Sequence, residues 1–210
     1  MAGISKPFAV KGYNVTSPKG EAVWCKVTEP DTKYNTKGVY SVNLVCEPND
    51  PTVKAFINKL EALRDQALAE TKETLGAKGN QYKARPVYSD DMDANYQPTG
   101  KIVFKFVMKD VSDRTERGQQ DKIIVVDAKK QQIKNIPLVG NGSEIRCVAF
   151  ANPYSNPKDK EIGISLIWTK MQLISLVEFG SDGDDFDEED GFSSEDAPFD
   201  TEEEKDELDF

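Results

Sequence analysis

The chain has no histidine among its 210 residues, and this absence restricts the chemistry it can perform. Histidine is the commonest general base in enzymes and the usual partner of a nucleophilic serine or cysteine. A hydrolase built from this sequence would need a lysine or a carboxylate in that place. We therefore expect a protein that is not an enzyme.

Cysteine is also scarce. The three cysteines, Cys25, Cys46 and Cys147, lie far apart, form no CxxC pair and have no histidine to complete a zinc site. Residues 140–145 begin like a dinucleotide-binding fingerprint but lack its third glycine, and residues 91–95 begin like a calcium loop that then breaks its pattern. We expect reduced thiols in the core, and neither a metal nor a cofactor.

Long apolar runs are missing as well. The longest, residues 147–151, has five residues, whereas a membrane span needs about 20. The N-terminus carries no apolar segment of the length that a secretory signal requires. The expectations that follow are no membrane association and residence in the cytoplasm.

Charge is present in quantity but unevenly distributed. The chain has 37 acidic and 27 basic residues, a net charge of −10. Residues 180–210 contain 16 acidic residues and one lysine, so the remaining 179 residues carry 26 basic against 21 acidic ones. A basic body with an acidic tail suggests two parts, a domain over residues 1–179 and a disordered tail over residues 180–210.

The body is mainly β by its pattern. Alternation of apolar and polar residues predicts strands from Glu21, over residues 39–46 and 102–109, near 122–127, over 145–151 and from 162 to 177. In the first strand, Val23, Cys25 and Val27 would point one way and Trp24 the other. Residues 78–95 have no sustained period and predict a long irregular connection, and residues 152–160 predict a loop.

One helix interrupts the strands. Asp50 and Pro51 form a start signal, and apolar residues follow at helical spacing until Gly76. One helix among five or six strands predicts a small antiparallel barrel or a sandwich. Alternation assigns four large aromatic residues to the core: Tyr40, Phe104, Phe106 and Trp168.

The remaining aromatic and basic residues form the combination that holds a single nucleic-acid strand, because cations bind phosphates and rings stack on bases of any sequence. The candidate stacking rings are Trp24, Tyr154, Tyr34, Tyr82 and Tyr88. The candidate phosphate contacts are Lys26, Lys33, Lys37, Lys83, Arg85, Lys101, Lys105, Arg114 and Arg117. Each has a plainer explanation: Trp24 covered by the helix or a partner subunit, Tyr154 packed as a loop anchor, and each cation merely solvated.

The tail suggests a second role. A flexible anionic segment tethered to a cationic groove competes with DNA at high effective concentration. Phenylalanines interrupt its charge, and Phe199, Asp209 and the terminal Phe210 are candidates for binding a partner protein. The plainer explanation is an acidic tail that keeps the protein in solution.

Several segments in this order resemble the phage-type single-stranded DNA-binding proteins, an OB-fold variant with an acidic tail that ends in phenylalanine. The segments are residues 38–45 (GVYSVNLV), 49–51 (NDP), 122–127 (KIIVVD), 136–143 (IPLVGNGS), 150–154 (FANPY) and Phe210. The resemblance implies a protein of DNA replication, recombination and repair that coats and anneals single strands. It also implies recruitment of the phage DNA polymerase and helicase-primase through the tail, and a possible homodimer. By position it implies DNA contacts at Trp24 and Tyr154, and more loosely around Lys83 and Arg85.

Two other classes stay open at this point. An acidic-tailed protein-interaction factor, such as an assembly chaperone or a DNA mimic, would use the tail itself as its active surface. An RNA-binding OB domain would prefer ribose through contacts with the 2′-hydroxyl.

Overall fold

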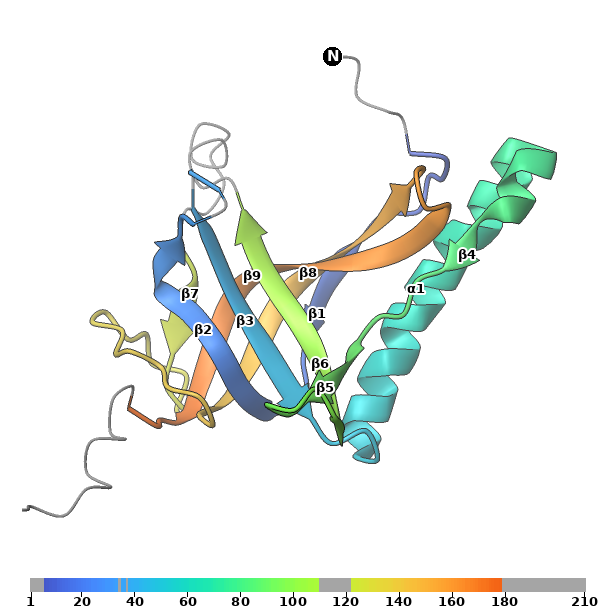
Figure 1. Ribbon diagram of the computed structural model, residues 1–210. Coiled ribbons are helices and arrows are strands. Elements are labelled where there is room, and N and C mark those ends of the chain that lie inside the picture. The colour runs from blue at the N-terminus through green and yellow to red at the C-terminus, as the bar shows by residue number, and fades with distance from the viewer. Residues whose placement is uncertain (1–5, 34, 37, 110–121, 179–210) are drawn as a thin grey trace, which may run out of the picture. The chain divides into compact units, whose positions relative to one another are not determined.

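Strands that pair around a closed path dominate the computed structural model, which describes residues 6–33, 35–36, 38–109 and 122–178 (Figure 1). In chain order the elements are β1 (Tyr13–Thr16), β2 (Gly20–Asp31), β3 (Val39–Cys46), α1 (Pro51–Leu75), the 3₁₀ helix η1 (Gly76–Gln81), β4 (Lys83–Ala84), β5 (Ser89–Met92), β6 (Pro98–Lys109), β7 (Ile124–Val126), β8 (Glu144–Asn156) and β9 (Glu161–Ser175). The described residues all belong to one compact unit, Met1–Gly180. The tail proposed over residues 180–210 lies outside them.

The strand order makes a ring. The pairings run from β8 to β2, β3, β6 and β9, and β9 pairs with β8 again. The β6–β9 pair is parallel, and so are the short pairings of β4 and β7 with β9. The prediction of a mainly β, OB-fold-like structure with one helix is confirmed, and the parallel pairings of β9 are the feature that the predicted antiparallel barrel did not include.

The interior of the ring follows the predicted alternation. Along β6, Phe104, Phe106 and Met108 point inward and are fully buried. Trp168 of β9 is also fully buried, and Tyr40 of β3 nearly so. The assignment of these aromatic residues to the core is confirmed. Burial of such large side chains supplies the main favourable term in folding.

Helix α1 begins where the sequence predicts. Oδ1 of Asp50 accepts a hydrogen bond from the Thr52 N–H at 2.6 Å, and Pro51 fills the first turn, where no N–H is needed. Hydrogen bonds from Thr52 lower the pKa of Asp50. One face of the helix is buried, and its Phe56 ring packs edge-on against Phe104 with centroids 5.0 Å apart.

The cysteines behave as core thiols. Cys46 and Cys147 are buried, Cys25 is half-buried, and all three are free. Desolvation raises the pKa of both Cys25 and Cys46 to about 12. Among the described residues, no three His, Cys, Asp or Glu side chains come together to hold a metal ion, and no helix is long and apolar enough to cross a membrane.

Three segments differ from the sequence prediction. The edge strand β1 was not predicted, because four residues are too few to show an alternation. The irregular connection predicted over residues 78–95 contains η1, β4 and β5. In the loop predicted over residues 152–160, residues 152–156 belong to β8, and a tight turn at residues 157–160 leads into β9.

Candidate nucleic-acid interface

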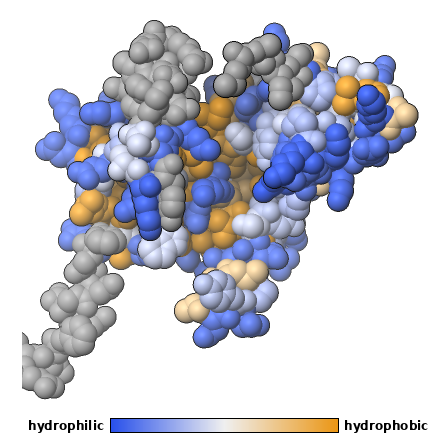
Figure 2. Space-filling model, turned by 45° about the horizontal axis from the view of Figure 1, so that its top comes forward, coloured by the Kyte–Doolittle hydropathy of each residue, from blue (hydrophilic) through white to orange (hydrophobic). Residues whose placement is uncertain are grey.

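A basic groove lies on the outer surface of the ring, across β3, β6, β8 and β9. We name it the basic groove, and its lining residues are Asp31, Asn35, Val39, Ser41, Arg85, Lys105, Val107, Lys109, Tyr154, Ile164, Ser165 and Leu166. Four aliphatic side chains contribute apolar surface, and cations and hydroxyl groups lie beside them. Figure 2 shows hydrophobic surface in the middle of one face of the molecule, bordered by hydrophilic side chains.

The cations of the groove come from strand β6 and from the residue that follows β4. Lys105 and Lys109 lie on the same face of β6, with Val107 between them, and both are exposed. Arg85 follows β4, and its Nη1 lies 3.4 Å from Oε2 of Glu161, a pair that is open to solvent. Three cations beside an apolar surface match the requirement of a sugar–phosphate backbone with stacked bases.

Tyr154 lies in the groove, but on a strand. The sequence placed it at a loop tip, whereas the structure puts it in β8, paired with Gly163 of β9. Its ring is half-buried and lines the groove together with Arg85 and Lys105. The ring is therefore held by a sheet, which fixes a stacking surface more firmly than a loop would.

Trp24 lines a neighbouring hollow. We name this the tryptophan hollow, and its lining residues are Trp24, Cys25, Lys26, Thr28, Glu29, Pro30, Asp31, Thr32, Leu138, Val139 and Asn141. The Trp24 side chain is 68% exposed, which excludes the explanation that the helix covers it. Lys26 lies two residues away and is also exposed.

A bulge, and not simple alternation, turns Trp24 outward. Ala22 and Val27 of β2 are both buried although they are five residues apart, and the β2–β3 register shifts between Val23 and Lys26. Trp24 has a φ of 54°, in the left-handed region. The predicted alternation is therefore wrong in detail, while the predicted outward direction of Trp24 is confirmed.

Asp31 lines both hollows. It stands at the end of β2, where it pairs with Val39 of β3. The basic groove and the tryptophan hollow are thus adjacent surfaces that meet at one carboxylate. About seven residues of strand separate Trp24 from Asp31, a span of roughly 23 Å at the rise of a β-strand.

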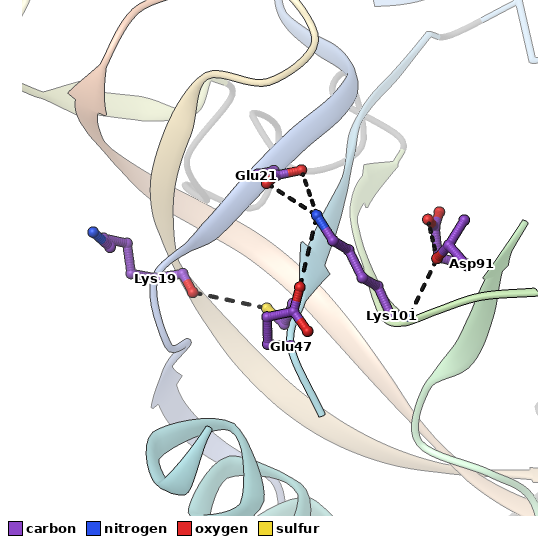
Figure 3. A network of polar contacts seen from close by, with 7 residues as sticks. Lys19, Glu21, Glu47, Asp91 and Lys101 are labelled. Atoms are coloured by element: carbon purple, nitrogen blue, oxygen red, sulfur yellow. Dashed lines mark hydrogen bonds and ion pairs between the residues drawn. The ribbon is translucent and has the colours of Figure 1, made fainter. Parts of the chain in front are cut away.

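Lys101, a predicted phosphate contact, lines neither hollow. Its Nζ lies 3.2 Å from Oε1 of Glu21 and 3.8 Å from Oε1 of Glu47, and Figure 3 shows the amino group pointing at both carboxylates. The hydrogen bond with Glu21 raises the pKa of Lys101. Lys101 shares the outward face of β6 with Lys105 and Lys109 but lies at the opposite end of that strand.

The structure corrects the prediction for Tyr82 and places Tyr88 outside both hollows. Tyr82 is only 7% exposed and packs with Phe8, Ala67 and Ile162, so no base can stack on its ring. Tyr88 packs edge-on against Phe104 with centroids 6.2 Å apart and lines neither hollow. Both sit among basic residues in the sequence, but tertiary packing buries only the ring of Tyr82, whereas Tyr88 stays 37% exposed.

The other candidates fall into two groups. Lys33 and Lys83 are exposed but line neither hollow. The candidates that lie outside the described residues are Tyr34, Lys37, Arg114, Arg117, Phe199, Asp209 and Phe210.

Sequence reasoning missed Lys109 and Ser41. Lys109 follows Lys105 by four residues in an alternating strand, so the period of two already places both on one face. Ser41 carries no such signal, because its place in the groove depends on the pairing of β3 with β6.

Fold and surface together define a class, the OB-fold-like proteins, whose members bind oligonucleotides across the outer surface of a strand ring. Comparison with known proteins narrows the class. The family model described as "Single-stranded DNA-binding protein, Bacteriophage T7" matches residues 19–178, so the chain belongs to this family. The resemblance seen in the sequence is confirmed, and with it the expectation of a non-enzymatic protein.

Individual relatives agree with the family model. The single-stranded DNA-binding protein of Enterobacteria phage T3 is 25% identical over 197 residues, which cover 88% of this chain and 83% of the relative. The corresponding protein of Escherichia phage T7 is 24% identical over 168 residues, which cover 74% and 69%.

Solved structures share the fold. The crystal structure of gp2.5, a single-stranded DNA-binding protein encoded by bacteriophage T7, matches with a TM-score of 0.63 and 23% identity over 87% of this chain and 99% of that chain. The single-stranded DNA-binding protein from bacteriophage Enc34, solved in complex with ssDNA, matches with a TM-score of 0.50 and 14% identity over 82% and 95%.

Proposed function

We propose that the chain binds single-stranded DNA without sequence preference, with the strand lying in the basic groove and continuing past Asp31 to Trp24. The observation that carries this proposal is the groove itself, which Arg85, Lys105 and Lys109 line together with Tyr154. The names of the T3 and T7 relatives support the same ligand. Stacking on Tyr154 and Trp24 contributes about 1–3 kcal/mol per base and accepts any base.

A salt titration tests this function. Three phosphate contacts predict that affinity for a single-stranded oligonucleotide falls about 20-fold between roughly 50 and 200 mM salt, because bound counterions are released on binding. Duplex DNA of the same length should bind more weakly, since its bases are not open to stacking. Equal affinity at both salt concentrations would contradict the proposal, and a clear preference for RNA would favour the RNA-binding alternative.

We propose further that the acidic segment over residues 180–210 competes with DNA for the basic groove. The charges support this: the segment carries 16 acidic residues and one basic one, and the groove offers Arg85, Lys105 and Lys109. Tethering keeps the local concentration of the segment high at any protein concentration. DNA would then release it.

The released segment would recruit other replication proteins, with Phe210, Asp209 and Phe199 as contact residues. The phage DNA polymerase and the helicase-primase are the proposed partners, a homodimer is the proposed assembly, and the cytoplasm of the host cell is the proposed location. Binding of the full chain to each purified partner, compared with a variant truncated before Phe210, tests this role. Equal binding by both would contradict it.

A further inference from the structure

The direction of Trp24 is unusual for its strand. In a regular strand, residues two apart share a face. Ala22 is fully buried, so a regular β2 would turn Trp24 into the core as well. The bulge between Val23 and Lys26 reverses this and leaves the Trp24 ring 68% exposed. The exposure of the ring therefore depends on this bulge.

The backbone of the bulge is strained at Trp24. A φ of 54° places Trp24 in the left-handed region, which glycine adopts readily and a bulky aromatic residue rarely does. Strained residues of this kind persist only where surrounding contacts hold them, and they occur preferentially at functional sites. One such contact reaches Trp24 from outside β2.

Asn141 supplies that contact. Its Oδ1 accepts a hydrogen bond from the Trp24 N–H at 2.9 Å, across 117 positions of the sequence. Two backbone bonds at Ala22, just before Trp24, also join the segments: the Ala22 N–H donates to the carbonyl of Ser143 at 2.8 Å, and the Gly142 N–H donates to the carbonyl of Ala22 at 3.0 Å. The bulge is thus bonded to the turn at residues 140–143.

The turn itself is firmly built. Gly142 has a φ of 87°, which favours glycine, and a Cβ on Gly140 would lie 2.7 Å from the carbonyl oxygen of Val177. The buried Ser143 hydroxyl donates to the carbonyl of Gly140 at 2.8 Å and accepts the Val177 N–H at 2.9 Å. Asn141 therefore projects from a rigid base.

We propose that Asn141 is a positioning residue that holds Trp24 in its left-handed conformation and so presents the indole ring for stacking on a single-stranded base. The stacking part rests on the proposed function, whereas the positioning part concerns the free protein. Asn141 also lines the tryptophan hollow, at whose edge the ring would receive a base.

Two readouts on the full chain test this role. Asn141→Ala should bind an oligothymidylate about tenfold more weakly, since a misplaced ring loses its stacking contribution. Acrylamide quenching of tryptophan emission in the free protein should fall, because Trp168 is fully buried and Trp24 alone is open to the quencher. Asn14→Ala, at an exposed asparagine of β1, is the matched control and should change neither readout.

Asn141→Asp keeps the Oδ1 acceptor and should leave the quenching as in the wild type, although its added charge weakens DNA binding. Unchanged quenching and affinity in Asn141→Ala would overturn the proposal. Failure of the wild-type chain to bind DNA would instead overturn the proposed function, and the quenching experiment would still decide the positioning role.

A stability cycle decides the same question without DNA. Glycine adopts a φ of 54° without strain, so Trp24→Gly should melt about 2–4 °C above Trp24→Ala. Asn141→Ala should lower Tm less when glycine occupies position 24 than when tryptophan does. A glycine needs no hydrogen bond from Asn141 to hold the left-handed conformation. Equal losses of Tm in the two backgrounds would overturn the proposal. This test remains usable even if Asn141→Ala is too unstable for binding studies.

Discussion

Tyr154 of β8 pairs directly with Gly163 of β9, and its ring lies over the glycine. A Cβ on Gly163 would lie 2.7 Å from both Cζ and the hydroxyl oxygen of Tyr154. The absence of a side chain at position 163 therefore gives the ring its place beside the basic groove.

Substitutions at this pair should weaken DNA binding in a graded way. Tyr154→Ala removes a stacked ring and should cost about 1–3 kcal/mol of binding free energy. Gly163→Ala should also weaken binding, because the ring must move away from the new methyl group, while Tyr154→Phe keeps the ring and should bind as the wild type does. Fluorescence anisotropy with a labelled oligonucleotide measures all three. Wild-type affinity in Tyr154→Ala would show that no base stacks there.

The lysines of β6 should differ in how much each contributes to DNA binding, because their surroundings differ. Lys105→Ala and Lys109→Ala should each reduce the slope of log affinity against log salt by about 0.7, the value for one phosphate contact on a single strand. Lys101→Ala is the matched control on the same strand and face, and its slope should not change, because Lys101 lines neither hollow. Equal slopes for Lys101→Ala and Lys105→Ala would contradict the proposed groove.

Asp31 should oppose binding. It is the carboxylate at which the basic groove and the tryptophan hollow meet, so a DNA strand that spans both passes a like charge. Asp31→Asn keeps an acceptor for the Lys33 N–H, which now donates to Oδ1 of Asp31 at 2.8 Å. We expect severalfold tighter binding at low salt and a smaller gain at high salt, where charges are screened.

The control for this variant is Glu73→Gln, an exposed carboxylate on α1. It changes the net charge by the same amount away from both hollows and should leave affinity unchanged. An equal gain in the two variants would mean that net charge, and not the position of Asp31, sets the effect.

Much of the fold follows from local pattern. Alternation placed Phe104 and Phe106 in the core, and the Asp50–Pro51 signal marked the start of the helix, because each depends on a few neighbouring residues. The parallel pairing of β6 with β9 joins segments about 60 residues apart and has no local signal.

The site follows from the sequence less completely, and for the same reason. Tyr82 and Tyr154 are both candidate stacking rings in the sequence. In the structure Tyr82 is buried with Phe8 and Ile162, whereas Tyr154 lines the basic groove. Lys101 and Lys105 share one strand face, but only Lys101 donates a hydrogen bond to Glu21, which lies 80 positions away in the sequence. Contacts between distant segments decide which side chains are available.

Removal of residues 180–210 should strengthen DNA binding. A competing anionic segment lowers the apparent affinity of the full chain, most strongly at low salt. The truncated chain retains the compact unit that holds both hollows, so its affinity can be compared directly. Weaker binding after truncation would contradict competition, and loss of all activity would favour a protein in which the acidic segment is itself the active surface.

The most direct test of the central claim is ultraviolet crosslinking of a single-stranded oligothymidylate to the full chain, with the crosslinked residues identified by mass spectrometry. We expect crosslinks at Tyr154 and Trp24, and none at Tyr82, which is buried. Crosslinks confined to other surfaces, with Tyr154 and Trp24 unmodified, would contradict it.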